Sequence, residues 1–376
     1  MNARQYLIRT VVASLAVIAV VVACNWLVDP YGITGAPRVA GVNASKVDIN
    51  QHVRLLKKYQ PMFAEYDTLI VGKSRVGMGI NPEHACFLKK GSEVYNIGVP
   101  GAELSTQIAY ALNVIYQQDI REVYLSVDFT DFIDTDPSRP AYSDDLFTKG
   151  EGDFQYLPSG ERNPDYWQVV FGDYLKALFS VDSLFSSIKT IATQGDGAAD
   201  RTERGFNPGN DFHSMVAVEG AHSLFAQKRE ELARKYGRPW YFRAADGSLP
   251  EQFALLEQFL DILRARNISV TLFVNPLHES FWSMLREEGH LEYYDDWSST
   301  LLKALRARDD ERLQFWDFAV ESQYIHETVP PPADRSGPLQ WFWEPSHYRR
   351  ELGDLMLDSM LSGSCGTEVT FGKRAL

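Results

Sequence analysis

The chain has 376 residues, of which 45% are apolar and 12% aromatic. This composition suits a large folded domain and excludes an intrinsically disordered protein. The formal net charge is −13 and no basic stripe is visible, which argues against nucleic-acid binding, because contact with phosphates needs a basic face.

The N-terminus contains a candidate membrane anchor. Residues 10–28 carry no charged side chain, and this run is close to the ~20 residues that a helix needs to cross the hydrocarbon core. Arg4 and Arg9 precede the run and Asp29 follows it. This charge distribution predicts a single-pass inner-membrane protein with residues 29–376 in the periplasm.

Two alternatives to an uncleaved anchor remain open. One is a cleaved signal peptide, although a conventional cleavage site is not evident. The other is a lipoprotein, because Val21–Cys24 resembles a lipobox that would be acylated at Cys24. All three interpretations place the remaining chain beyond the inner membrane.

Residues 29–65 are predicted to form a juxtamembrane segment, and residues 66–376 an α/β domain. Short apolar runs predict strands at Thr68–Val71, Val94–Asn96, Val123–Val127, Ile268–Val274 and Leu313–Phe318. Helical spacing of apolar residues predicts helices around 54–58, 104–115, 214–236, 253–263 and 297–307, and a C-terminal helix through Leu352–Met356. This alternation predicts a doubly wound, mostly parallel sheet.

Residues 134–247 interrupt the alternation of strands and helices. They contain Pro and Gly breakers and a polar stretch at 193–211, so we interpret them as a long insertion or cap on the sheet. Ligands of doubly wound sheets bind beyond the carboxyl ends of the strands. Gly72–Arg75, Asn96–Gly101 and Asp128–Asp131 each follow a predicted strand, and are therefore expected to meet at one crevice.

Ser74 follows the first predicted strand at a predicted helix start. Free amides and the helix dipole favour developing negative charge there, but a serine hydroxyl needs a base to become a nucleophile. Glu344 lies three residues before His347, a spacing that lets a carboxylate hold Nδ1–H while Nε2 faces a hydroxyl. The alternatives are an N-cap serine and an ordinary helix-start motif.

Together these segments resemble blocks of the SGNH (GDSL-type) hydrolase and acyltransferase superfamily. Gly72–Ser74 resembles the first block, Asn96–Gly101 the second, and Glu344 with His347 the last. The Val-Asp-Pro-Tyr-Gly sequence at Val28–Gly32 resembles the membrane-anchored bacterial branch of this superfamily. The resemblance covers about residues 66–128 and 253–357.

The resemblance implies a three-layer α/β/α fold and serine-based acyl chemistry without a cofactor. Ser74 would be the nucleophile, His347 the base and Glu344 the group that orients it. The amides of Ser74 and Gly101, with Gly98 as the alternative glycine, would form the oxyanion hole. Substrate contacts are expected at Asn96, Gly98, His278 and Trp343, for which loop stabilisation and core packing are the competing explanations.

Two positions depart from the superfamily pattern. Glu344 replaces the usual Asp, and Asp128 occupies the position of an Asn that normally contributes to the oxyanion hole. An ionised Asp128 would repel an oxyanion. It would therefore have to be neutral, turned away, or serving another purpose.

The remaining residues limit other kinds of chemistry. No His or Cys spacing near Asp128, Asp131 and Asp134 suggests a metal site, and we predict none. Cys86 and Cys365 would form one disulfide in an oxidising compartment, or else remain two separate buried thiols.

These observations predict an acyl esterase or O-acyltransferase acting on cell-envelope carbohydrate. The partners expected are an acylated substrate, the inner membrane through residues 10–28, and a membrane protein of polysaccharide export or acyl-donor supply. The alternative is a catalytically inactive SGNH-like scaffold that binds polysaccharide or an export-complex partner.

Overall fold

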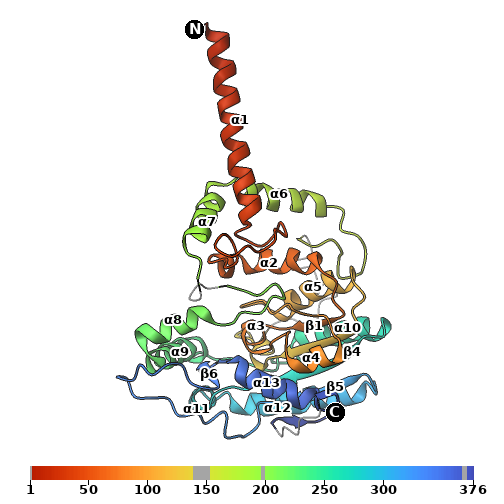
Figure 1. The fold of residues 1–376 in the computed structure, drawn as a ribbon. Coiled ribbons are helices and arrows are strands. Elements are labelled where there is room, and N and C mark those ends of the chain that lie inside the picture. Colours follow the sequence, from red (N-terminus) through yellow and green to blue (C-terminus); the bar gives the residue numbers. More distant parts are fainter. Residues whose placement is uncertain (1, 139–152, 196–199, 366–370) are drawn as a thin grey trace.

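The computed structural model describes residues 2–138, 153–195, 200–365 and 371–376. A single long helix, α1 (Ala3–Val28), projects from an α/β domain that contains the rest of the described chain (Figure 1). It is long and apolar enough to cross a membrane by length and composition. At about 1.5 Å per residue, its 26 residues span roughly 39 Å.

The domain is built on a six-stranded sheet with the order β2-β1-β3-β4-β5-β8. Its strands are β1 (Thr68–Val71), β2 (Val94–Asn96), β3 (Glu122–Val127), β4 (Ser269–Val274), β5 (Leu313–Asp317) and β8 (Lys373–Arg374). The first five pair in parallel, and β8 is antiparallel to β5. The predicted α/β class with a mostly parallel sheet is confirmed.

Helices connect the strands and cover the sheet. They are α2 (Val53–Tyr59), α3 (Ser74–Gly79), α4 (Ala85–Lys90), α5 (Leu104–Ile115), α6 (Tyr166–Phe179), α7 (Val181–Ala192), α8 (Asn210–Glu219), α9 (Ala221–Tyr236), α10 (Glu251–Ala265), α11 (Glu279–Glu287), α12 (Leu291–Ala307), α13 (Arg350–Met360) and α14 (Ser362–Cys365). The single helix predicted over 214–236 is divided at Gly220, whose φ of 84° an α-helix cannot contain.

The strand order fixes where a ligand site can form. From β1 the chain goes to β2 on one side and then to β3 on the other, so the order reverses at β1. In doubly wound sheets the crevice lies at this reversal, beyond the carboxyl ends of the strands. Ser74 lies three residues after the end of β1 and Asp128 directly follows β3, which brings both residues to the crevice.

The segment that carries Glu344 and His347 is a short β-hairpin and not the helix start that was the alternative interpretation of this motif. Glu344 ends β6 (Phe342–Glu344) and His347 begins β7 (His347–Tyr348), and the two strands pair antiparallel. Only Pro345 and Ser346 separate them, so this tight turn holds the carboxylate and the imidazole on neighbouring strands. The helix α13 starts after the hairpin.

The C-terminal helices α13 and α14 pack against α3 and α4, the helices that follow β1. Gly353 of α13 lies so close to α3 that a Cβ there would approach the Gly79 carbonyl oxygen to 1.8 Å. Cys86 in α4 and Cys365 in α14 form a disulfide with their Cα atoms 5.2 Å apart. Closing a loop of 279 residues stabilises the fold by roughly 5 kcal/mol in the chain-entropy account.

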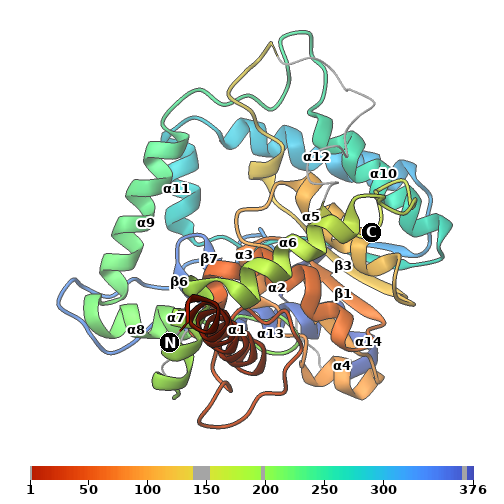
Figure 2. The same cartoon turned by 90° about the horizontal axis from the view of Figure 1, so that it is seen from above.

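The described helices between residues 134 and 247 form two separate pairs. The helices α6 and α7 pack against the base of α1, whereas α8 and α9 pack together and α9 contacts β6 and α11 (Figures 1 and 2). The insertion therefore supplies one pair of helices at the base of α1 and a second pair beside β6 and α11. Its sequence did not indicate this division.

Candidate active site

Ser74 and His347 meet at the carboxyl end of β1. Ser74 is the first residue of α3, and its Oγ lies 2.7 Å from Nε2 of His347. Nδ1 of the same imidazole contacts Oε1 of Glu344. The sequence separates Ser74 from His347 by 273 residues, so the fold brings together the serine, histidine and carboxylate that acyl chemistry requires.

Glu344 is held as an anion. Its side chain is buried, and it accepts hydrogen bonds from the Ser346 amide (3.1 Å) and hydroxyl (2.9 Å). Burial opposes its ionisation, but the charge and hydrogen bond of His347 outweigh that cost and lower the pKa of Glu344 to about 2. The Glu344 carboxylate thus holds Nδ1 of the His347 imidazole and fixes the orientation of the ring.

This carboxylate should contribute to acid stability, and Glu344→Gln tests it. Because the folded pKa of Glu344 is about 2 and its ordinary value is 4.5, the stabilisation is present above pH 4.5 and is lost as the pH falls towards 2. The full shift corresponds to on the order of 3 kcal/mol. Urea denaturation of wild type and variant at pH 7 to 3 should show a shallower pH dependence for Glu344→Gln; parallel curves would contradict the assignment.

The Asp128 carboxylate is engaged by two neighbouring side chains, those of Arg75 and Asn275. Arg75 Nη1 lies 2.8 Å from Asp128 Oδ1, and Asn275 donates its amide to the same oxygen at 2.8 Å. Although burial works against the charge, Arg75 and its neighbours keep the pKa of Asp128 below its ordinary value. An ionised carboxylate has no proton to offer an oxyanion, so the expected oxyanion role of Asp128 is revised to a structural one.

Arg75 links this carboxylate to the hairpin formed by β6 and β7. Its Nε donates to the Ser346 carbonyl at 2.8 Å, and Ser346 is the residue before His347. Tyr348, the residue after His347, donates to Asn275 Oδ1 at 2.9 Å. Both sides of His347 are therefore tied to Asp128, one through Arg75 and the other through Asn275.

Lys73, which precedes Ser74, donates to Asp131. Asp131 also accepts from Gln107 at 3.4 Å. The lysine charge next to Ser74 is therefore balanced by a carboxylate after β3.

The amides assigned to an oxyanion hole lie in two different settings. Ser74 starts a helix, where the first amides have no intrahelical acceptor. The Gly98 amide already donates to Asn96 Oδ1 at 2.9 Å, and a Cβ on Gly98 would lie 2.6 Å from the Gly77 nitrogen. Gly98 thus packs the loop against α3. Gly101 lies in a left-handed turn with φ of 65°, and its role as the second donor stays a prediction.

Three residues expected to contact substrate are engaged within the protein. Asn96 is fully buried and donates to the Val76 and Ile80 carbonyls at 2.9 and 2.8 Å. His278 caps α11, and both its ring nitrogens have partners, Ser280 and the Glu327 carbonyl. Trp343 is 3% exposed. The observed geometry favours stabilisation and packing at these positions.

The insertion supplies residues that the sequence did not point to. The Asn207 backbone amide donates at 2.8 Å to the carbonyl of Gly77, which lies in the helix that Ser74 starts. The Phe212 ring lies 6.3 Å from the His347 ring and 5.5 Å from the Trp343 ring, between centroids. The polar stretch before α8 has no periodicity that would have revealed this approach.

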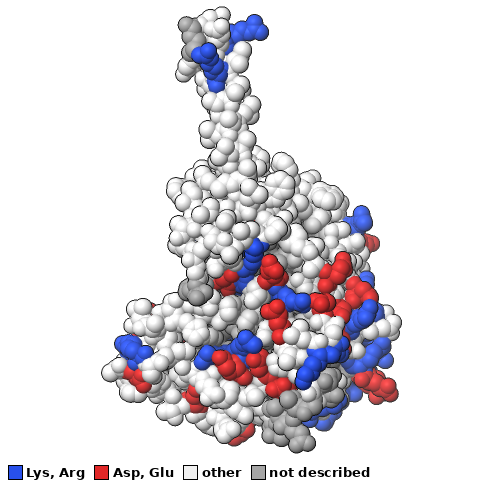
Figure 3. All heavy atoms as spheres, viewed as in Figure 1, with Lys and Arg blue, Asp and Glu red and all other residues white. Residues whose placement is uncertain are grey.

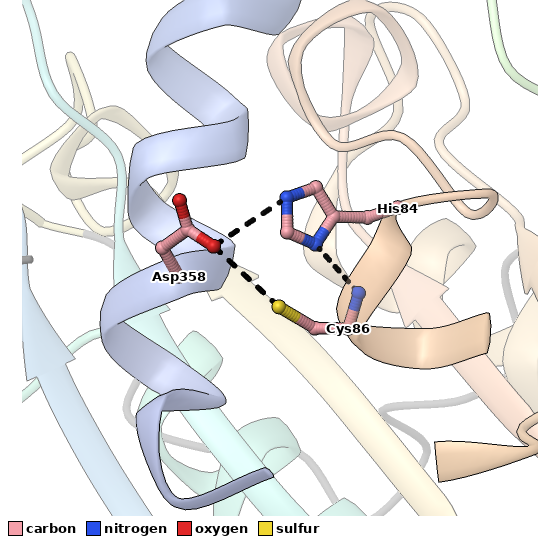
Figure 4. A group of neighbouring side chains, drawn as sticks. All are labelled: His84, Cys86 and Asp358. Atoms are coloured by element: carbon pink, nitrogen blue, oxygen red, sulfur yellow. Dashed lines mark hydrogen bonds and ion pairs between the residues drawn. The ribbon is translucent and has the colours of Figure 1, made fainter. Parts of the chain in front are cut away.

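A second polar cluster lies around the disulfide. His84, Cys86 and Asp358 place possible ligand atoms within 4.8 Å of one another (Figure 4). However, the Cys86 sulfur is bonded to Cys365, and His84 Nδ1 accepts the Cys86 amide at 3.3 Å. These donors do not fit a metal centre and are better explained as contacts that surround the disulfide.

No protein-family model and no curated protein sequence matches the chain. The resemblance to the SGNH superfamily therefore depends on the motifs and on the geometry of the site.

Proposed function

We propose that this protein is a serine acyl esterase or O-acyltransferase of the SGNH type. The observation that carries the proposal is the chain of contacts from Ser74 Oγ through both nitrogens of His347 to Glu344. The parallel sheet with its site beyond β1 and β3 supports the family assignment.

The mechanism follows from these contacts. His347 Nε2 takes the proton of Ser74 as Oγ attacks the acyl carbonyl, while Glu344 stabilises the imidazolium. The Ser74 and Gly101 amides would hold the tetrahedral oxyanion. Collapse of this tetrahedral intermediate breaks the ester bond of the substrate. His347 gives the proton to the leaving alcohol, and the acyl group stays on Ser74 Oγ. Water or a sugar hydroxyl then attacks the acyl group, and its proton passes through His347 to Ser74.

The proposed substrate is acylated carbohydrate of the cell envelope. Residues 10–28 of α1 would anchor the protein in the inner membrane, with the catalytic domain in the periplasm. The apolar length of α1 and the arginines at its free end support this location. The intact mass of the protein isolated from membranes would distinguish an uncleaved anchor from a cleaved signal peptide or a lipid on Cys24.

The function is tested with the purified full chain in nanodiscs. We expect a fluorophosphonate to label it and p-nitrophenyl acetate to form an acetyl-enzyme, detected by intact mass. Adding envelope oligosaccharides then separates the two reactions, since a transferase yields acetylated sugar and an esterase only free acetate. A folded protein that neither labels nor turns over would reject the proposal in favour of an inactive scaffold for polysaccharide or an export partner.

A further inference from the structure

The helices α6 and α7 form an apolar surface on the side of the domain from which α1 projects. We call these two helices the interfacial pair. Each has a stripe of exposed apolar side chains at helical spacing: Trp167, Phe171, Leu175 and Phe179 on α6, and Val181, Phe185, Ile188 and Ile191 on α7. Trp167 is 74% exposed and Phe185 67% exposed.

The pattern of α7 is opposite to that of a surface helix in water. Its buried positions are polar, namely Ser183, Ser186, Ser187 and Thr190. Surface helices of globular proteins normally bury the apolar stripe and expose the polar face. The outward face of α7 is therefore suited to an apolar environment and not to water.

The inner face of α6 shows which way its stripe points. Asp173 of α6 accepts from Lys58 and Tyr59 of α2, both at about 2.7–2.8 Å, and Ala177 is buried. Figure 1 shows α2 beneath α6 and α1 rising above it. The exposed stripe is thus on the side away from the domain core.

The end of α1 is fixed between the two helices. The Asn25 side chain donates to the Leu178 carbonyl of α6 at 2.9 Å and accepts from Ser187 of α7 at 2.9 Å. Lys46 donates to the carbonyls of Val28 and Asp29, where α1 ends. The interfacial pair therefore lies at the level where the apolar run of α1 leaves the domain.

The charge distribution agrees with this placement. On the face of the domain shown in Figure 3, the Lys, Arg, Asp and Glu side chains gather away from α1, and the surface next to the base of α1 is almost uncharged. Two charged residues of the interfacial pair form ion pairs with the rest of the domain: Lys189 with Asp48, and Asp173 with Lys58. Lys176, Asp182 and Lys189 are the exposed charged residues of the pair, and of these Lys189 is neutralised by Asp48.

We infer that the interfacial pair docks the domain on the lipid bilayer, with its apolar stripes at the boundary between headgroups and acyl chains. Trp26 of α1, 58% exposed, and Trp167 would be the interfacial aromatic anchors. The inference holds for an intact α1 and equally for a lipid on Cys24, because both put the membrane at the same end of the domain. It does not depend on the proposed catalytic activity.

Site-specific fluorescence in nanodiscs tests this inference. Single cysteines at Phe171→Cys, Phe185→Cys and Val218→Cys, each combined with Cys24→Ser in the full chain, would carry a nitrobenzoxadiazole probe. Val218 is the matched control, because this apolar residue is 78% exposed on α8. Lipids with a nitroxide near the glycerol end of the acyl chain should quench the probes at 171 and 185 several-fold more than the probe at 218.

Two results would overturn the inference. Quenching at 171 and 185 no stronger than at 218 would show that water covers the interfacial pair. Blue-shifted emission at 171 and 185 without lipid quenching would show that a second copy or another protein covers it.

Discussion

Ser74→Ala and His347→Ala are each expected to abolish fluorophosphonate labelling and to lower kcat for p-nitrophenyl acetate by about 10⁴-fold or more. Alanine at 74 removes the attacking oxygen, and alanine at 347 removes the base that lies 2.7 Å from it. Because the two groups act as one unit, the double variant should be no slower than the worse single variant.

The control for this experiment is Ser299→Ala, which removes an exposed hydroxyl on α12. It should retain labelling and turnover. Circular dichroism should show that all variants keep the fold, since the Ser74 hydroxyl forms its hydrogen bond with His347 and not with a residue of the hydrophobic core. Turnover that survives in Ser74→Ala would show that another residue carries the chemistry and would contradict the proposed mechanism.

Arg75→Met is expected to lower the free energy of unfolding by about 3–5 kcal/mol, because it leaves the Asp128 carboxylate buried without its cation. Turnover should fall as well, since the variant also removes the hydrogen bond from Arg75 to Ser346, which positions His347. Asp128→Asn should destabilise for the converse reason. The double variant Arg75→Met with Asp128→Asn should recover part of the loss, giving a coupling energy from urea denaturation.

A surface ion pair provides the matched comparison for Arg75. Arg243 and Asp296 are 2.7 Å apart, with side chains 39% and 41% exposed. Arg243→Met should therefore cost no more than about 1 kcal/mol. Equal effects of Arg75→Met and Arg243→Met, or simple additivity of Arg75→Met and Asp128→Asn, would contradict the structural role given to Asp128.

The five parallel strands were predictable from sequence because they are short apolar runs with polar or glycine boundaries, whereas the edge strand β8, Lys373–Arg374, has no apolar residue and was not predicted. Thr68–Val71 and Val94–Asn96 have the predicted bounds, and β4 and β5 differ from theirs by one residue. Ser74 and His347 were also expected together, since both follow from the order of the motifs. The division of 214–236 at Gly220 was missed because periodicity alone does not fix where a helix breaks.

The parts that were not predicted depend on contacts between distant residues. The ion pair of Arg75 with Asp128 depends on the register of β1 against β3, which no local pattern encodes. Likewise, the apolar spacing of α7 shows that one face is apolar but not what that face contacts. Only the buried positions of Ser183, Ser187 and Thr190 show that the apolar face points outward.

The disulfide between Cys86 and Cys365 also affects how the protein would survive proteolysis. A single backbone cut anywhere between residues 87 and 364 leaves two fragments that are still covalently joined. Ser74 lies on the first fragment and His347, for any cut before it, on the second, while the packing of α13 on α3 holds them face to face. A protein nicked in its middle would therefore migrate as one species without reductant and as two with it.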